Sequence, residues 1–182
     1  MIRVLFVCLG NICRSPMAEA VLRERLFEEG LSDKVEVDSA GTGNWHIGKD
    51  PHPGTLKILD DHGISADGIK GRQLHWRDFD EFDYVIGMDR TNIDDIRSML
   101  GQPDHSKILR FLDLTDHLKD VPDPYFTGDF QETYQLIGEG CEALLVKIKR
   151  DPTRRTEDVI SAPIRENLWW PKLKRLLGSF LE

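Results

Sequence analysis

The sequence predicts an α/β protein in which a twisted sheet of four parallel strands carries helices on both faces. Two observations lead to this fold class. Short apolar runs alternate with segments whose apolar residues recur every three or four positions, which is the spacing of one helix face. The chain has 182 residues, of which 40% are hydrophobic and 31% charged, and this is typical of a soluble globular domain.

The elements are expected in the following order. A nearly continuous apolar run over 2–7 indicates a strand that is buried on both faces. Ser15 and Pro16 have the residue types of a helix N-cap and of a first helical position, so a helix is expected to begin there and to end near Gly30. The remaining expected elements are strands over 35–37, 82–88 and 107–112 and helices over about 55–62 and 129–149.

This alternation predicts a doubly wound, three-layer arrangement of the flavodoxin-like kind. In such sheets, ligands bind beyond the carboxyl ends of the strands. The first strand ends at Cys8, so the segment 8–15 is the expected place of a functional site.

Composition argues against several kinds of partner. The net charge of −8 disfavours nucleic acid, and no apolar run reaches the roughly 18 residues of a membrane span. The first residues lack the basic and apolar regions of a secretory signal. Three cysteines form no disulfide framework, so reduced thiols and a cytoplasmic location are expected.

The segment from Cys8 to Ser15 joins a buried strand to a helix N-terminus, where unpaired N–H groups and the helix dipole favour an anion. Gly10 lets the backbone curl and Asn11 tolerates a left-handed conformation, so the loop can surround a tetrahedral oxyanion. Arg14 adds a planar group that can hold two phosphate oxygens. Cys8 is then expected at the floor as a stabilised thiolate, placed for in-line attack on phosphorus.

The spacing of Cys8 and Arg14 is a weak signal by itself. The alternative is a buried thiol that ends the strand while Arg14 lies on the surface. The strand before the loop and the helix after it favour the phosphate site. Ser15 is expected to stabilise the departing thiolate, to cap the helix, or to do both.

A longer stretch is more distinctive and runs Cys8-Leu9-Gly10-Asn11-Ile12-Cys13-Arg14-Ser15-Pro16-Met17-Ala18-Glu19-Ala20. It closely resembles the phosphate loop of low-molecular-weight protein tyrosine phosphatases. Further landmarks of that family follow in its order, namely Asp38-Ser39-Ala40-Gly41-Thr42, Trp45, His62-Gly63-Ile64, Met88-Asp89 and Asp123-Pro124-Tyr125. The resemblance implies a domain of this family over 1–150, which hydrolyses phosphotyrosine in proteins and small aryl phosphates without a metal or cofactor.

The resemblance also implies the catalytic roles. Cys8 is the nucleophile that carries a phosphocysteine, Arg14 binds the phosphate, and Asp123 is the general acid and then the general base. An acid is needed because a tyrosyl oxygen leaves poorly unless it is protonated. Without the resemblance, Asp123-Pro124 would equally suit an ordinary turn.

The other site residues follow from the same resemblance. Asn11 holds the shape of the loop through a bond to Ser39, with Ser15 in support. Trp45, Tyr125 and Ile12 form the walls of the substrate cleft. Flat aromatic walls favour a phenyl ring as substrate. The alternative is that Trp45 and Tyr125 are ordinary aromatic residues of the core or the surface. The loop that binds phosphate comprises Leu9, Gly10, Asn11, Ile12, Cys13, Arg14 and Ser15.

Two cysteines remain. The resemblance implies that Cys13 pairs with Cys8 when peroxide oxidises the nucleophile, and a neighbouring thiol would trap the oxidised sulfur reversibly. The alternative is that Cys13 is a small apolar filler. Cys141 lies on the apolar stripe of the last helix and is expected in the core.

Three other functions compete with this one. Phosphoarginine phosphatases resemble the sequence but carry Thr where this chain has Ile12. Arsenate reductases of the thiol-relay type need two further cysteines, which are missing between Cys13 and Cys141. A catalytically inactive phosphate-binding module is the third, and it is disfavoured because every catalytic residue is present. The chain also lacks the histidine that family members commonly have after Ile64, so the support of Asn11 is expected to be rearranged.

The chain continues beyond the family domain. From Lys147 to Glu182, nine Lys and Arg residues face five Asp and Glu residues, a net charge of +4 that leaves −12 for the rest. The segment 151–182 is expected to be a short, basic, helical extension that contains Trp169 and Trp170. Packing on the domain or on a second subunit is favoured over peripheral membrane contact, because Pro171 would break a long interfacial helix.

Overall fold

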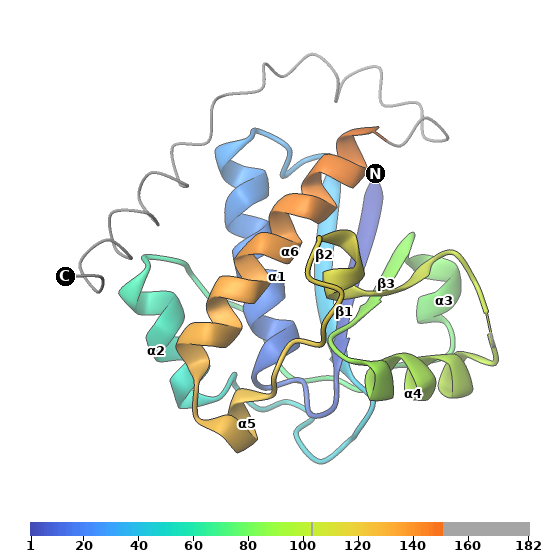
Figure 1. The fold of residues 1–182 in the computed structure, drawn as a ribbon, viewed down its shortest axis with the longest axis horizontal. Helices are drawn as coiled ribbons and strands as arrows, with labels where there is room; N and C mark the ends of the chain where they lie inside the picture. The colour runs from blue at the N-terminus through green and yellow to red at the C-terminus, as the bar shows by residue number, and fades with distance from the viewer. Residues whose placement is uncertain (103, 151–182) are drawn as a thin grey trace. The chain divides into compact units, whose positions relative to one another are not determined.

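The computed structural model describes residues 1–102 and 104–150. Strands and helices alternate along this part of the chain (Figure 1). In chain order they are β1 (Ile2–Cys8), α1 (Arg14–Glu28), β2 (Val35–Gly41), α2 (Pro53–Asp61), α3 (Asp78–Glu81), β3 (Tyr84–Gly87), α4 (Arg90–Leu100), β4 (Ile108–Arg110), the 3-10 helix η1 (Phe111–Leu114), α5 (Pro124–Thr127) and α6 (Phe130–Arg150).

The four strands form one parallel sheet in the order β2-β1-β3-β4, which confirms the predicted architecture. β1 lies inside the sheet and pairs with β2 along its whole length, so that Cys8 lies opposite Gly41. The chain leaves β1 on one side to form β2 and continues on the other side to form β3. A crevice is expected beyond the carboxyl ends of β1 and β3, because the connections after these two neighbouring strands leave in opposite directions. Cys8 lies at this place.

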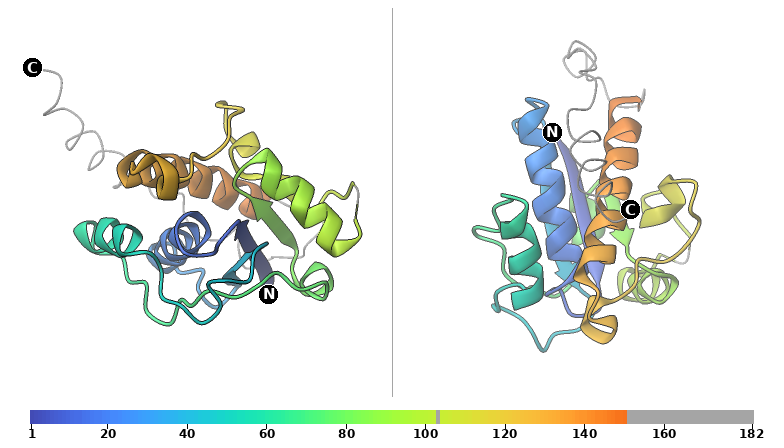
Figure 2. Two further views of the ribbon diagram at one scale, coloured as in Figure 1. Left: turned by 90° about the horizontal axis from the view of Figure 1, so that it is seen from below. Right: turned by 60° about the vertical axis from the view of Figure 1, so that its left-hand side comes forward.

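Helices cover both faces of the sheet, as predicted (Figures 1 and 2). On one face α1 packs against β1, β2 and α6, and Phe6 of β1 meets Phe111 edge to face, with ring centroids 5.2 Å apart. On the other face α4 shares a core cluster with Leu5 and Val85. Neighbouring residues of β1 thus point to opposite faces, and both faces are apolar, which explains the continuous apolar run of its sequence.

Helix α6 packs closely against η1, and two of its residues, Gly140 and Cys141, are suited to the core. At Gly140, a Cβ atom would come within 2.6 Å of the Phe111 ring, so the absence of a side chain lets the two elements approach. Cys141 is fully buried beside it, as predicted.

The sequence interpretation misses α3, α4 and α5. The sequence of α4 does contain start and stop signals for a helix. Asp89 caps the helix by accepting from the Asn92 N–H at 2.6 Å, and Gly101 ends it with a φ of +66°. Its buried residues Ile93 and Ile96 also have helical spacing. Helices α3 and α5 have four residues each, which is too short for a periodic pattern.

Several boundaries also differ from the prediction. β2 continues to Gly41 because it pairs with β1 throughout. β4 ends at Arg110, where the chain turns into η1 instead of extending to 112. The predicted extension over 151–182 lies outside the described residues. Within the described part, no helix combines the length and the apolar character needed to cross a bilayer.

Candidate active site

The loop after β1 leads directly into α1. The helix begins at Arg14, with Cys13 in the N-cap position and no side-chain cap. The prediction that Ser15 caps the helix and Pro16 opens it is therefore wrong. Both lie inside the first turn, which tolerates proline because its backbone N–H groups have no partner within the helix. Ser15 is fully buried, and its Oγ lies 3.0 Å from Cys8 Sγ.

Asn11 makes the sharp turn of the loop. Its φ is +53°, in the left-handed region that asparagine tolerates better than most residues. Gly10, the predicted source of the curl, does not have a positive φ, and a Cβ atom there would lie 3.2 Å from the His46 ring. The turn brings the Asn11 N–H to 3.3 Å from Cys8 Sγ, to which it donates.

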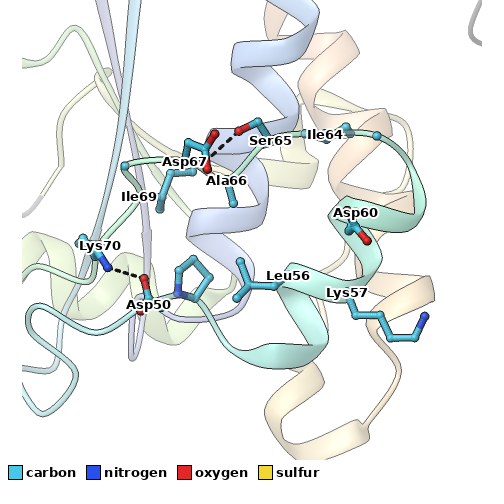
Figure 3. A pocket seen from close by; sticks show the side chains of 13 residues that line it. Asp50, Leu56, Lys57, Asp60, Ile64, Ser65, Ala66, Asp67, Ile69 and Lys70 are labelled. Atoms are coloured by element: carbon cyan, nitrogen blue, oxygen red, sulfur yellow. Dashed lines mark hydrogen bonds and ion pairs between the residues drawn. The ribbon is translucent and has the colours of Figure 1, made fainter.

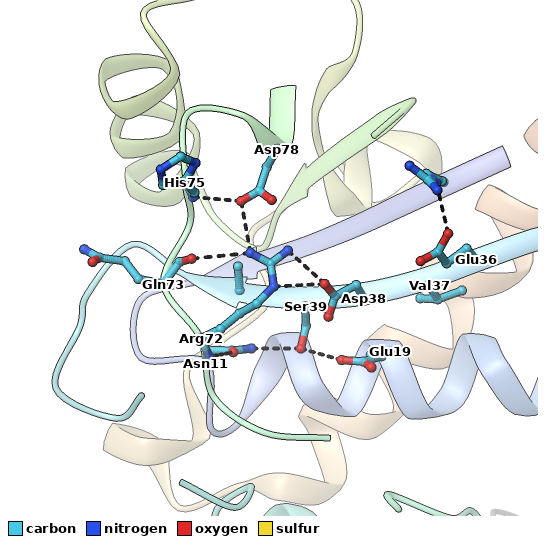
Figure 4. Close-up of polar contacts among 12 residues, drawn as sticks. Asn11, Glu19, Glu36, Val37, Asp38, Ser39, Arg72, Gln73, His75 and Asp78 are labelled. Atoms are coloured by element: carbon cyan, nitrogen blue, oxygen red, sulfur yellow. Dashed lines mark hydrogen bonds and ion pairs between the residues drawn. The ribbon is translucent and has the colours of Figure 1, made fainter. Parts of the chain in front are cut away.

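The side chain of Asn11 is fixed by three hydrogen bonds, of which Figure 4 shows the one to Ser39. Its Nδ2 donates to Ser15 Oγ at 2.9 Å and to Ser39 Oγ at 2.8 Å. Its Oδ1 accepts from the backbone N–H of Arg72 at 2.8 Å. The amide is therefore fully bonded without the histidine that the family resemblance suggests, and the Arg72 backbone supplies the remaining donor.

Arg72 is itself held in place by acids, as Figure 4 shows. Its guanidinium donates to Asp38 at 2.9 Å and to Asp78 at 3.0 Å. Burial disfavours the cation, but the hydrogen bonds and charges of these two carboxylates outweigh it and raise the pKa of Arg72. The backbone that supports Asn11 is thus anchored to β2 and to α3.

Arg14 is 3% exposed and lies between two carboxylates. Nη1 donates to Asp89 at 2.5 Å, and Nη2 donates to Asp123 at 2.6 Å. Burial opposes the cation, but the negative charges of Cys8, Asp123 and Asp89 raise the pKa of Arg14. Its Nε is buried and has no hydrogen-bond partner among the residues that the structure describes, so this donor is suited to a bound anion.

Asp123 is placed by the short helix α5. As the N-cap, it accepts through Oδ1 from the Tyr125 N–H at 3.1 Å, and Pro124 follows as the first helical residue. Its Oδ2 pairs with Arg14, and its side chain remains 19% exposed. The fold thus brings Cys8, Arg14 and Asp123 together, although Asp123 is more than a hundred positions from the loop.

A hollow of about 240 Å³ opens at this point. Ile12, Trp45 and Tyr125, the predicted cleft residues, all line it. His46 and Phe126 also line it and were not predicted. The complete lining is Cys8, Leu9, Gly10, Ile12, Cys13, Trp45, His46, Asp123, Tyr125 and Phe126.

The missed residues differ in the signal that the sequence carries for them. Asp89 follows the carboxyl end of β3, the neighbour of β1, so the rule that points to Cys8 also points to it. Phe126 and His46 each adjoin a predicted aromatic wall. Glu19 lies among the buried residues of α1, and only its tertiary contact with Ser39 reveals it.

Cys13 lines the hollow with a free, buried thiol. Burial and then the negative charges of Cys8 and Asp123 raise its pKa to about 12. Cys13 is therefore a protonated thiol at neutral pH. This makes it a poor first target for an oxidant compared with a thiolate.

A larger hollow of about 940 Å³ lies between α2 and the loop after it (Figure 3). Asp50 and Lys70 form an ion pair across one end, and Ser65 accepts from the Asp67 N–H at 3.1 Å. Its lining contains no cysteine and no arginine, so it lacks the pair of residue types that meets at the loop after β1. Within residues 1–102 and 104–150, no group of three or more His, Cys, Asp or Glu side chains is arranged to hold a metal ion.

Comparison with known proteins identifies a family for the chain. Residues 3–154 match the family model of the low molecular weight phosphotyrosine protein phosphatases. The chain is 55% identical over 153 residues to the low molecular weight protein-tyrosine-phosphatase YfkJ of Bacillus subtilis (strain 168), which covers 83% of this chain and 98% of that protein. It is 44% identical over 161 residues to the low molecular weight protein-tyrosine-phosphatase PtpA of Staphylococcus saprophyticus, and the match covers 86% of this chain and 100% of that protein.

Solved structures give the same picture. The crystal structure of YfkJ from Bacillus subtilis superposes with a TM-score of 0.80 at 56% identity, covering 82% of this chain and 95% of that one. The crystal structure of a Drosophila arginine phosphatase superposes with a TM-score of 0.74 at 34% identity, covering 83% and 99%.

Proposed function

The chain belongs to the low molecular weight phosphotyrosine protein phosphatase family and is an enzyme of that family, and on this premise we propose that it hydrolyses phosphotyrosine in proteins through a phosphocysteine on Cys8. The observation that carries the proposal is that Cys8 and Asp123 line one hollow at the N-terminus of α1, where Arg14 pairs with Asp123. We place the enzyme in the cytoplasm, in keeping with three free cysteines.

The first step transfers the phosphoryl group. The dianion lies in the loop, where backbone N–H groups and Arg14 donate to its oxygens and offset charge in the transition state. The thiolate of Cys8 attacks phosphorus in line with the tyrosyl oxygen. As the P–O bond breaks, the carboxyl of Asp123 gives its proton to that oxygen, and tyrosine leaves as the neutral phenol.

The second step releases phosphate. Asp123, now a carboxylate, takes a proton from a water molecule whose oxygen attacks phosphorus. The S–P bond breaks, and the electron pair returns to Cys8 as a thiolate. Ser15 Oγ lies 3.0 Å from this sulfur and donates a hydrogen bond to the departing thiolate, so it assists this step more than the first.

The acid lies next to the group that binds phosphate. Asp123 Oδ2 accepts from Arg14 Nη2 at 2.6 Å, so the same carboxyl group is within reach of the reacting phosphate in both steps.

The walls of the hollow favour an aryl group. Trp45, Tyr125 and Phe126 line it, and flat aromatic faces stack on a phenyl ring. A second candidate substrate is phosphoarginine, because the structure is similar to that of a Drosophila arginine phosphatase. Ile12 on the wall offers only apolar surface to a guanidinium, which favours phosphotyrosine. Rates on phosphotyrosine and phosphoarginine peptides separate the two.

The test of this proposal is steady-state hydrolysis of p-nitrophenyl phosphate as a function of pH. The wild type is expected to be most active in mild acid, because the first step needs a proton donor for the leaving oxygen. Cys8→Ser is expected to abolish turnover, and Asp123→Asn to lower kcat by about 10² to 10³. A folded wild-type protein without turnover would sink the enzymatic proposal and leave a phosphate-binding module.

A further inference from the structure

Glu19 is a buried acid that the proposed reaction does not use. It lies on the second turn of α1, is 2% exposed, and extends toward Ser39 of β2 (Figure 4). One carboxylate oxygen pairs with Arg23 on the next turn, and the other accepts from Ser39 Oγ at 2.5 Å. A buried carboxylate is costly unless its contacts compensate for lost hydration, so these contacts indicate its role.

Ser39 connects Glu19 to the phosphate loop. Its Oγ accepts from Asn11 Nδ2 at 2.8 Å, and the second N–H of the same amide donates to Ser15 Oγ at 2.9 Å. Ser15 Oγ in turn lies 3.0 Å from Cys8 Sγ. An unbroken chain of hydrogen bonds therefore runs from Glu19 to the nucleophile.

Glu19 and the Arg72 backbone together set the direction of the hydrogen bonds in this chain. An ionised carboxylate can only accept, so the Ser39 hydroxyl must give its proton to Glu19 and accept from Asn11. The amide of Asn11 cannot turn over, because its Oδ1 already accepts from the Arg72 backbone N–H at 2.8 Å. Asn11 is thus a donor on both of its Nδ2 hydrogens.

The orientation of the Asn11 amide also determines how the Ser15 hydroxyl is oriented. Because its Oγ accepts from Asn11, the Ser15 proton remains for an acceptor of its own. The acceptors within reach are Cys8 Sγ at 3.0 Å and the Ala40 carbonyl oxygen at 3.3 Å. A negatively charged sulfur is the stronger of the two.

We propose that Glu19 is a positioning residue for the nucleophile, which acts through Ser39 and Asn11 to hold the Ser15 proton on Cys8. The inference rests on the proposed function, in which Cys8 leaves phosphorus as a thiolate in the second step. A preset donor stabilises that thiolate without rearrangement as the S–P bond breaks. Glu19 therefore affects breakdown of the phosphocysteine more than its formation.

The charges that face Glu19 come from three elements. They are Arg23 on the same helix, Asp38 on β2 and Arg72 in the segment before α3. Burial raises the pKa of Glu19 to about 7, Asp38 adds to this effect, and the Ser39 hydrogen bond with the two arginines opposes it. Both protonation states are thus present at neutral pH. A protonated carboxyl is a weaker acceptor, so positioning strengthens as the pH rises through about 7.

Two substitutions at Glu19 test the proposal with p-nitrophenyl phosphate. Glu19→Gln keeps a neutral acceptor for Ser39, and Glu19→Met removes the acceptor at similar volume. Glu24→Gln, five residues further along α1, removes the same charge and is the matched control. We expect Glu19→Met to lower kcat roughly tenfold with a smaller change in KM, and Glu19→Gln to restore most of it at about pH 6.

The ratio of wild-type to Glu19→Gln kcat isolates the ionisation of Glu19, since titration of the other groups is largely shared by both proteins. We expect this ratio to be near one at about pH 6 and to rise about threefold by pH 8, and to stay flat for Glu24→Gln. In a Ser39→Ala background, Glu19→Gln is expected to change nothing. A flat ratio, or the same rise without Ser39, would overturn the proposal.

A readout that needs no turnover separates this proposal from the proposed function. Amide hydrogen exchange in the loop 9–15 is expected to be faster in Glu19→Met and in Ser39→Ala than in the wild type or Glu24→Gln. Unchanged exchange in both variants contradicts the positioning role even if Glu19→Met folds poorly, because Ser39→Ala breaks the same bond from the other side. Wild-type protein without phosphatase activity instead contradicts the proposed function.

Discussion

The floor and the rim of the hollow are built in opposite ways. The floor consists of Cys8, Asn11 and Ser15, which are at most 3% exposed and are joined by hydrogen bonds inside the protein. The rim consists of Trp45, Tyr125 and Phe126, which are 60%, 58% and 76% exposed and present apolar rings.

This difference separates two tasks. A buried network holds the reacting atoms in one geometry, and an error there removes catalysis. Exposed rings contribute contact area to a substrate and can change without disturbing the floor. Substitutions in the floor are therefore expected to lower kcat, and substitutions in the rim to raise KM.

Among substitutions that leave Cys8 and Asp123 in place, the largest effect is expected from Asn11→Ala. Alanine is strained at a φ of +53°, and three hydrogen bonds of the side chain are lost. We expect kcat on p-nitrophenyl phosphate to fall roughly a hundredfold. Asn11→Gly is the control, because glycine relieves the backbone strain but restores no side-chain bond. Full activity in the glycine variant would show that the backbone turn alone matters.

A smaller effect in the same region is expected from Ser15→Ala. Loss of the donor to Cys8 Sγ slows release of the thiolate, so kcat should fall about tenfold. Stopped-flow measurement should then show a burst of p-nitrophenol larger than in the wild type, because the phosphocysteine accumulates. A loss of kcat without a larger burst places the effect of Ser15 on the first step instead.

The rim is tested by Phe126→Ala. Removal of this exposed ring should raise KM for a phosphotyrosine peptide about threefold and leave kcat nearly unchanged. Phe27→Ala, on an exposed part of α1, is the matched control and should change neither constant. If kcat falls as strongly as in Ser15→Ala, floor and rim are not separate.

The smallest effect on the rate is expected from Cys13→Ser. This residue lines the hollow as a protonated thiol with a pKa of about 12, so its substitution should change turnover less than twofold. Its role should emerge only after oxidation: wild-type activity is expected to return with added thiol after peroxide, and the variant is expected to recover poorly. Equal recovery of both proteins excludes Cys13 as the partner of oxidised Cys8.

The floor could be predicted from the sequence because it is local. Cys8, Asn11 and Ser15 lie on one strand, the loop after it and the start of one helix, where periodicity and capping rules apply. The rim was found through resemblance, and Phe126 and His46 were missed because no local rule predicts an exposed ring that meets a distant loop. The Ser15 cap was predicted wrongly because the Ser15 hydroxyl oxygen accepts from Asn11 and the helix starts two residues earlier, at Arg14.

The strands of the sheet could be predicted from the sequence, whereas the shortest helices could not. Strands β1 and β3 are buried on both faces and leave a continuous apolar run in the sequence. Helices α3 and α5 owe their existence to their surroundings, since each has four residues and is placed by chain contacts around it. Asp123 belongs to such an element, so only resemblance could identify it.

The two ion pairs of Arg14 have a consequence for the end of the catalytic cycle. Asp89 and Asp123 occupy the same guanidinium donors that an incoming phosphate needs, so the protein carries its own competing counter-ions. In the proposed reaction, these carboxylates are expected to oppose tight retention of inorganic phosphate and to pair with Arg14 again as the product departs. We therefore expect only weak inhibition by the product, although the site is proposed to bind a dianion strongly enough to react with it.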